Sequence, residues 1–251
     1  MRADSAAGPA GAPAEARVLE ARVLDFRPSR HGFHFANRFA SGPTVRLGPF
    51  DPRRIGVADA SAGLCGGMAF TVRDLWERQV PPPPDREPPA NGTRRFTALV
   101  RRQVHSLDWL RLPIRFWVLG AFHPDPPTWW SRLLRRTPLG ELVQGIEWPR
   151  VRREIDTGRL AQLGLVRAAA SDPRRLTANH QVLAYGYRVD PDWVTLRIYD
   201  PNWPDRDDVE LRLFVPPDAP ARLEQSTGEP FRGFFLAPYR PAEPRAWLGA
   251  R

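Results

Sequence analysis

The only cysteine of this 251-residue chain, Cys65, stands among glycines at the start of a segment whose apolar residues recur at helical spacing. A helix N-terminus offers unpaired N–H groups and a partial positive charge, and both favour the thiolate over the thiol. The neighbouring Gly66 and Gly67 leave room for the backbone of a substrate to approach. These residue types fit a nucleophile, although a lone cysteine among small residues is also a common buried apolar side chain.

A histidine and a carboxylate are predicted to meet at one edge of a hairpin. His180 lies near the start of a predicted strand over 178–187, and Asp200 follows a second predicted strand over 193–199. A short polar turn makes these strands antiparallel neighbours, so the two side chains share an edge of the sheet. An imidazole oriented by Asp200 or Asn202 and facing a cysteine supplies what covalent catalysis needs. Taken separately, His180 also fits an ordinary strand residue, and Asp200 an ordinary turn.

The elements expected around these residues are helical first and strand-like later. Apolar spacing predicts helices over 65–80, 94–107 and 148–155. Alternating or aromatic patterns predict strands over 18–26, 31–39, 160–166, 178–187, 193–199, 209–215 and 231–239. Prolines at 81–84 end the first helix, and Gly158 closes the third. Helices followed by strands define an α+β fold, in which the nucleophile helix packs on a mostly antiparallel C-terminal sheet.

One domain is predicted over 18–240, with a disordered segment over 1–17 and a flexible tail over 241–251. Within it, a segment at about 108–147 is rich in Trp and Pro and has no clean period. We expect this Trp-rich insertion to cover the core, or else to contact a protein partner or a membrane surface.

Composition limits the classes of function. The net charge of +9 invites a nucleic-acid hypothesis, but all 37 basic residues are Arg and are scattered in pairs among carboxylates. No nucleic-acid partner is therefore expected. A single cysteine excludes an internal disulfide and any metal site built from several cysteines. His31 and His34, three apart on a predicted strand, make a poor metal pair, and the turn at 200–205 departs from the pattern of a calcium loop. No metal and no cofactor is therefore expected. With no signal peptide and no apolar run of about 18 residues, the sequence predicts a cytoplasmic chain without a transmembrane segment.

Four blocks of sequence carry a resemblance to a known superfamily. They are LCGGMA at 64–69, REIDTGRL at 153–160, NHQVLAYGY at 179–187 and IYDP at 198–201. In this order and spacing they resemble the papain-like cysteine peptidases, and within them the bacterial peptidases that remove leader peptides from secreted bacteriocins. The resemblance implies a papain-like fold.

The resemblance also implies a role for each matching residue. Cys65 is expected to be the nucleophile, His180 the general base and acid, and Asp200 the group that orients the imidazole. Asn202, with Trp203 after it, is a secondary candidate for the orienting group, because papain itself has an Asn followed shortly by a Trp.

One position departs from the pattern of such enzymes. They place a Gln six residues before the cysteine, where its amide helps to hold the oxyanion, and this chain has Asp59 there. A carboxylate would repel the oxyanion, and the loss of one donor costs about 100-fold to 1000-fold in rate. Asn37 is a candidate replacement, together with the backbone N–H of Cys65.

The leading hypothesis is a hydrolase of the papain-like cysteine peptidase type, or a related acyl-transfer enzyme, acting on the amide of a peptide or protein substrate. A second hypothesis is a catalytically inactive module that binds a protein partner through the Trp-rich insertion. A third, an Arg-rich nucleic-acid binder, predicts strongly salt-dependent binding. A nucleophile elbow over 63–67 is disfavoured, because the small residues at 55–61 make a poor preceding strand.

Overall fold

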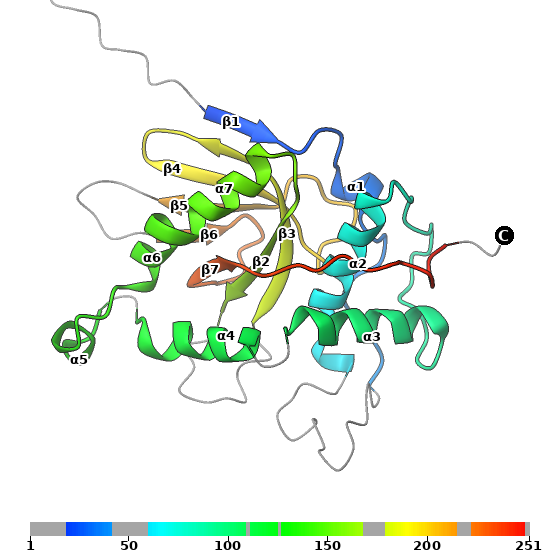
Figure 1. Ribbon diagram of the computed structural model, residues 1–251, viewed down its shortest axis with the longest axis horizontal. Coiled ribbons are helices and arrows are strands. Elements are labelled where there is room, and N and C mark those ends of the chain that lie inside the picture. The colour runs from blue at the N-terminus through cyan, green and yellow to red at the C-terminus, as the bar shows by residue number, and fades with distance from the viewer. Residues whose placement is uncertain are drawn as a thin grey trace, which may run out of the picture.

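An antiparallel sheet forms the centre of the fold in the computed structural model (Figure 1). The structure describes residues 19–41, 60–108, 111–124, 127–167, 179–214 and 222–248. Its strands are β1 Leu19–Arg22, β2 Ala161–Val166, β3 His180–Val189, β4 Trp193–Tyr199, β5 Glu210–Phe214, β6 Arg222–Gln225 and β7 Gly233–Leu236. They lie in the order β6-β5-β4-β3-β2-β7. The long strand β3 pairs with β2 along its first half and with β1 along its second.

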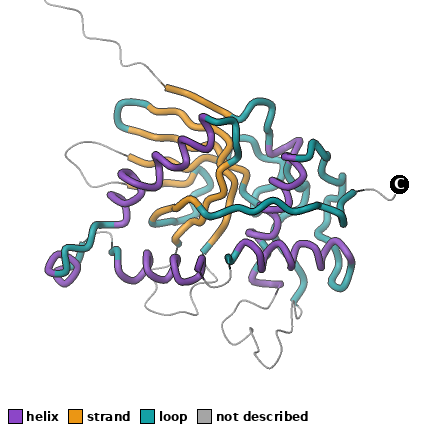
Figure 2. Tube along the Cα trace, in the orientation of Figure 1, coloured by secondary structure: helices purple, strands orange, loops and turns teal. Residues whose placement is uncertain are grey.

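Helices lie across this sheet and along its lower and right-hand sides in Figure 2. They are α1 Pro28–His31, the 3-10 turn η2 Ala60–Ala62, α2 Cys65–Glu77, α3 Arg94–Ser106, α4 Arg111–Phe122, α5 Trp129–Leu133, α6 Leu139–Leu142, the π-helical turn η3 Val143–Glu147 and α7 Trp148–Asp156. Helices α2 and α3 lie toward one end of the molecule, and α5 lies at the opposite end (Figure 1). None of the described helices is long and apolar enough to cross a membrane.

Alternate residues of β3 face two different layers. Val182 and Ala184 belong to the hydrophobic cluster that includes α7, whereas Leu183 belongs to the cluster that includes α2. A β-bulge after Ala184 shifts this alternation by one residue, so Tyr187 returns to the α7 cluster. There its hydroxyl donates a hydrogen bond of 2.6 Å to Asp156. The strand that carries His180 is thus held from both faces.

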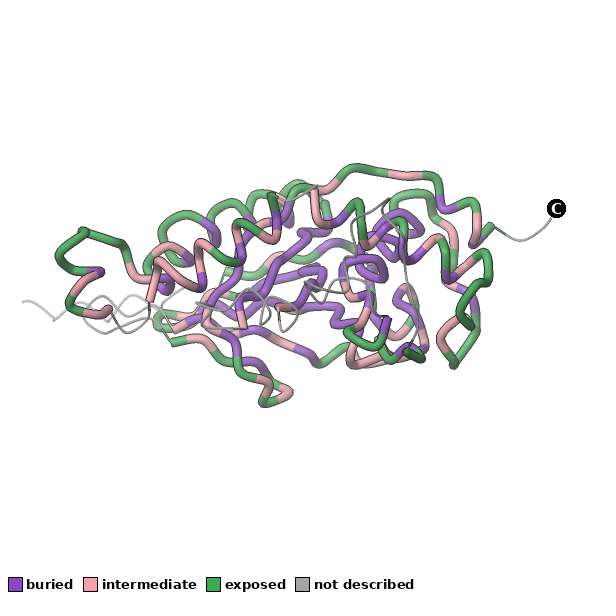
Figure 3. The backbone as a smooth tube through the Cα atoms, turned by 90° about the horizontal axis from the view of Figure 1, so that it is seen from below, coloured by how far each residue is buried: buried purple, intermediate pink, exposed green. Residues whose placement is uncertain are grey.

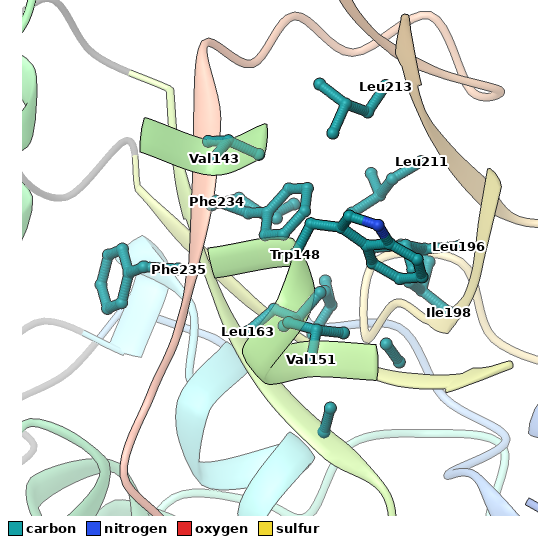
Figure 4. Close-up of a cluster of buried hydrophobic side chains, with 14 of the residues drawn as sticks. Val143, Trp148, Val151, Leu163, Leu196, Ile198, Leu211, Leu213, Phe234 and Phe235 are labelled. Atoms are coloured by element: carbon teal, nitrogen blue, oxygen red, sulfur yellow. The ribbon is translucent and has the colours of Figure 1, made fainter. Parts of the chain in front are cut away.

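The cluster on the α7 side is the larger of two hydrophobic cores (Figure 4). Trp148 and Val151 of α7 pack there near Leu163 and Phe234 of the sheet. Trp148 also stands edge-on to Tyr187, with 5.0 Å between the ring centroids. Burial of each such side chain contributes about 1.5–3 kcal/mol to the free energy of folding. The central strands are buried along most of their length (Figure 3) and therefore form a rigid base for the site.

Helix α2 is buried along almost its whole length and still carries charge. Asp74 is 2% exposed and pairs with Arg102 of α3 at 2.8 Å. It also accepts hydrogen bonds from the Tyr239 hydroxyl at 2.7 Å and from the Ala242 backbone N–H at 3.0 Å. A buried carboxylate without such partners would cost several kcal/mol. This cluster therefore fixes α2 against α3 and against the C-terminal segment.

The start of α2 approaches α3 closely at Gly67. A Cβ atom at Gly67 would lie 2.3 Å from the carbonyl oxygen of Leu99. The Gly67 N–H donates instead to the side-chain oxygen of Gln103 at 2.8 Å. The Leu99 carbonyl oxygen is a backbone atom and cannot rotate away, so a larger residue at position 67 has to push α2 and α3 apart.

We expect Gly67→Ala to lower the free energy of unfolding by about 1–3 kcal/mol in urea titrations, because overpacking outweighs the gain in helix propensity. Gly145→Ala is the matched control, since Gly145 lies in the helical turn η3 and its Cβ would meet nothing within 4 Å. Equal stability of the Gly67→Ala variant and the wild type would show that the close approach of α2 and α3 is not required.

The structure confirms the predicted α+β class, with helices α2, α3 and α7 close to the bounds expected from sequence. The strand predicted over 31–39 is wrong. Of these residues only His31 belongs to a regular element, the helix α1 that begins at Pro28, and residues 32–39 are irregular. Phe33 and Phe35 are buried by packing and not by strand pairing. Strand β6 was not predicted.

Of the predicted insertion and the two chain ends, the structure describes most of the insertion, part of the C-terminal tail and none of segment 1–17. The insertion expected at 108–147 contains α4, α5, α6 and η3, and Phe116 of α4 packs edge-on against Phe235 at 4.9 Å. The segment predicted as disordered, 1–17, lies outside the described residues. The tail at 241–251 is described to Leu248, and Trp247 in it packs against Phe33 at 4.7 Å.

Candidate active site

Cys65 is the first residue of α2 and is half-buried. Directly before it, the Leu64 N–H donates a hydrogen bond of 2.6 Å to the side-chain oxygen of Asn37. The thiol is held by His180 and by the backbone N–H groups of Gln181 and Gly66. The sulfur therefore faces donors from two directions, the helix start and the first residues of β3.

The hairpin of β3 and β4 brings His180 to Asp200 as expected. Leu183 pairs with Tyr199, so the start of β3 and the end of β4 meet at one edge. His180 Nε2 lies 2.6 Å from Asp200 Oδ1, and both residues are buried. With Nε2 engaged in this way, Nδ1 is the ring nitrogen left for the Cys65 thiol. The nucleophile candidate, the imidazole and the carboxylate therefore form one continuous hydrogen-bonded chain.

The electrostatics of this chain favour a thiolate paired with an imidazolium. Burial alone would raise the pKa of the Cys65 thiol, but the charge and hydrogen bond of His180 outweigh it and the pKa falls below its ordinary value. Burial alone would lower the pKa of His180, yet the charges of Asp200 and Cys65 raise it to about 10. With this pKa, His180 carries its proton at neutral pH, and its positive charge beside the sulfur favours the thiolate over the thiol.

Asp200 is kept ionised in spite of being 1% exposed. Burial would raise the pKa of its carboxyl group, and His180 reverses this effect, followed by the hydrogen bond from the Asn202 backbone N–H. That N–H lies 2.9 Å from Oδ1, and the side-chain amide of Gln225 donates to Oδ2 at 3.0 Å. Three donors thus satisfy the two oxygens of the carboxylate, which is how a buried charge is tolerated.

Behind Gln225 stands a further ion pair. Arg167 and Glu229 lie 3.0 Å apart, and the Gln225 side chain bonds to both, donating to Glu229 at 3.1 Å and accepting from Arg167 at 3.4 Å. Trp203 donates its ring N–H to the same Glu229 carboxylate at 3.3 Å. The orientation of the Gln225 amide is therefore fixed by neighbours of opposite charge.

Of the remaining predicted residues, Asn202 and Asn37 lie near the site but not on the imidazole. The Asn202 side chain accepts a hydrogen bond of 3.2 Å from Asn37 and does not bond to His180. Asn37 therefore links the turn after β4 to the residue before Cys65, and its amide keeps a second N–H beyond the bond to Asn202. Asp59, at the position of the expected oxyanion glutamine, lies outside the described residues.

The sequence did not reveal Gln225, Arg167 or Glu229. Gln225 ends the four-residue strand β6, which is too short and polar to be recognised by alternation. Only the pairing of β6 with β5 places it beside Asp200. Arg167, directly after β2, looks like any other arginine of an arginine-rich chain. A half-buried ion pair between segments distant in sequence leaves no local signal.

Other features of the described residues do not belong to this site. They contain no group of three or more His, Cys, Asp or Glu side chains that could hold a metal ion. A hollow of about 490 Å³, lined in part by Thr93, Arg95 and Trp247, contains none of the three residues Cys65, His180 and Asp200.

Comparison with known proteins returned no match to this chain among protein-family models, curated proteins or solved structures.

Proposed function

We propose that this protein is a thiol hydrolase of the papain-like type that cleaves an amide of a peptide or protein substrate with Cys65 as nucleophile. The observation that carries the proposal is the hydrogen-bonded chain from Cys65 through His180 to Asp200. Within it the pKa of the cysteine falls while that of the histidine rises. Groups with opposed shifts of this kind, one of them reachable from solvent, are typical of catalytic sites.

The proposed reaction proceeds in two halves. The Cys65 thiolate attacks the carbonyl carbon, and the imidazolium of His180 gives its proton to the departing amine as the C–N bond breaks. The product is a thioester on Cys65 and a neutral His180. A water molecule, deprotonated by His180, then attacks the thioester carbon, which releases a carboxylic acid and restores the thiolate. An amine in place of water would turn the same intermediate into acyl transfer.

Donors for the oxyanion stand at the start of α2. The N–H groups of a first helical turn have no partner within the helix, and that of Cys65 has no acceptor in the described part of the chain. The second N–H of Asn37, whose side chain accepts from the Leu64 N–H, is the side-chain candidate. Two such donors would supply the stabilisation that Asp59 cannot.

A binding module without catalysis is the competing function, and the geometry favours it less. A dead site would be expected to have lost the contact between thiol and imidazole or to have been covered by tryptophan side chains. Cys65 instead bonds to His180 and remains half-buried.

The test is cleavage of a mixed fluorogenic peptide library, combined with intact-mass analysis of the protein after exposure to peptidyl acyloxymethyl ketones. We expect a covalent adduct on Cys65 and cleavage that falls by at least about 10,000-fold in Cys65→Ala. Cleavage that survives Cys65→Ala contradicts the proposal. Equal ketone labelling of native and urea-unfolded protein, with no cleaved peptide, favours the binding module.

A further inference from the structure

Exposed apolar side chains gather on α4, on α5 and directly after α5. The exposed fractions of the side chains are 55% at Ile114, 36% at Trp117, 78% at Trp129, 74% at Leu133 and 59% at Leu134. The other large exposed apolar side chains of the described residues are spread over separate elements. Single exposed apolar residues are ordinary, but a cluster of them indicates a surface that contacts another molecule or a membrane.

Contacts between the end of α4 and the residues after α5 hold the two parts together. Trp117 stacks edge-on against Phe122 at 5.1 Å, and the guanidinium of Arg136 lies 6.0 Å from the centre of the same Phe122 ring. The ring Nδ1 of His123 bonds to the carbonyl oxygen of Thr137 at 2.8 Å. The end of α4, with Trp117, therefore lies beside the residues that follow α5.

Ser131 marks the inner side of α5. Thr128 caps the helix through the Ser131 N–H, and the buried Ser131 hydroxyl donates back to the Thr128 carbonyl oxygen at 2.9 Å. With Ser131 inside, Trp129 and Leu133 face outward.

Arginines are interleaved with these apolar residues. Arg132, Arg135 and Arg136 are all exposed, and none of them lies within ion-pair distance of a carboxylate among the described residues. We call the whole set the Trp-Arg patch. It consists of Ile114, Trp117, Trp129, Arg132, Leu133, Leu134, Arg135 and Arg136.

We propose that the Trp-Arg patch docks on a membrane surface rich in anionic phospholipids. Tryptophan rings favour the headgroup level of a bilayer, leucines enter the outer edge of the acyl chains, and arginines pair with lipid phosphates. The charge of the patch is complementary to such a surface. A second copy of the chain fits less well, because a two-fold arrangement would bring the arginines of both patches face to face.

This docking would leave the candidate active site free. Helix α2, which carries Cys65, lies toward the opposite end of the molecule from α5 (Figure 1). A protein held by the Trp-Arg patch would therefore present the thiol away from the lipid. The proposal does not depend on Cys65 being catalytic.

The experiment is flotation of the full chain with vesicles of phosphatidylcholine alone, or of phosphatidylcholine with about one third phosphatidylglycerol. We expect flotation only with the anionic vesicles, and weaker binding as salt is raised. The variant Arg132→Gln/Arg135→Gln/Arg136→Gln should bind about 100-fold more weakly. The variant Trp129→Ser/Leu133→Ser should also lose binding, because these two apolar side chains can then no longer enter the membrane interface.

Matched controls separate the patch from the general charge of the protein. Arg94→Gln/Arg101→Gln/Arg245→Gln removes the same charge from exposed positions on α3 and on the C-terminal segment. Leu24→Ser removes a side chain that is 78% exposed, as is Trp129. Both controls should float like the wild type.

Four results would overturn the proposal. One is absence of wild-type flotation with anionic vesicles, and another is equal flotation with neutral ones. The third is loss of binding in the Arg94, Arg101 and Arg245 control to the same degree as in the patch variant. The fourth is a wild-type dimer in sedimentation that becomes a monomer in Trp129→Ser/Leu133→Ser, which would assign the patch to a second copy of the chain instead.

Discussion

His180→Ala should change the pH profile of Cys65 alkylation from level to steep. With the imidazolium present, the pKa of the thiol lies below its ordinary value, and we expect the sulfur to be ionised across the neutral range. The rate of reaction with iodoacetamide should then be nearly constant between about pH 6.5 and 8.5. Without His180, burial remains and the thiol reverts to an ordinary or raised pKa, so the rate should rise about tenfold per pH unit.

At pH 6.5 the variant should react at least about 10-fold more slowly than the wild type. The thiolate fraction of an unassisted cysteine is only about 1% there, and the stronger nucleophilicity of a more basic thiolate offsets part of the loss. The second-order rate constant, measured by mass spectrometry across the pH range, gives this difference directly. Parallel profiles for the wild type and His180→Ala, both rising toward pH 8.5, would mean an ordinary thiol.

Two further variants protect this measurement against trivial explanations. His180→Gln can still donate a hydrogen bond to Asp200 but cannot become a cation, so it should show the steep profile in a folded protein. His123→Ala removes a histidine that directly follows α4 and bonds to Thr137, and it should leave the level profile unchanged. A steep profile in His123→Ala would point to a general effect on the fold.

The central pair could be inferred from sequence because its geometry is local. The strand pattern at 193–199 and the short turn before it determine the register of β3 and β4, and this register alone brings His180 and Asp200 together. The start of α2 was equally clear, since helical spacing begins at Cys65 and prolines follow at 81–84. Short-range rules are sufficient for such features.

Other parts of the site depend on contacts that no local pattern encodes. The segment around Phe33 and Phe35 resembles a strand in sequence, but its aromatic rings pack against each other at 4.8 Å without joining the ladder. Asn37 reaches the start of α2 from that irregular segment. Gln225 reaches Asp200 only through the order of strands in the sheet. Burial in the assembled fold, and not propensity, decides these positions.

Asp200→Asn should lower the free energy of unfolding and weaken formation of the Cys65 thiolate, although aspartate and asparagine have the same shape. The carboxylate accepts from His180 and Asn202 at Oδ1 and from Gln225 at Oδ2. An asparagine would set its own NH₂ group against one of these donors. Rotation of the Gln225 amide does not relieve the conflict, because its oxygen would then face the carboxylate of Glu229.

The expected cost is about 1–3 kcal/mol of unfolding free energy, the usual penalty for a buried polar group left without a partner. Without the negative charge, the pKa of His180 should fall, since Asp200 is the strongest influence that raises it. The alkylation profile of Cys65 should therefore steepen, as in His180→Ala.

The difference in stability between wild type and Asp200→Asn should itself depend on pH. The folded-state pKa of Asp200 lies below its ordinary value of 3.8, so its contribution is present above pH 3.8 and is lost as pH falls through the folded value. The pKa of His180 is raised from 6.5 to about 10, so its contribution is complete below pH 6.5 and is lost as pH rises toward 10. The gap should be widest between about pH 4 and 6.5.

Urea titrations of both proteins at pH 3, 5.5 and 9.5 test this shape, with Asp208→Asn as control. Asp208 is an exposed carboxylate that pairs with Arg206, and its loss should leave the unfolding midpoint unchanged at every pH, because exposed ion pairs contribute little. A gap between wild type and Asp200→Asn that stays constant from pH 3 to 9.5 would show that the carboxylate is not coupled to His180. The level alkylation profile of the wild type would then need another cause than the chain from Cys65 to Asp200.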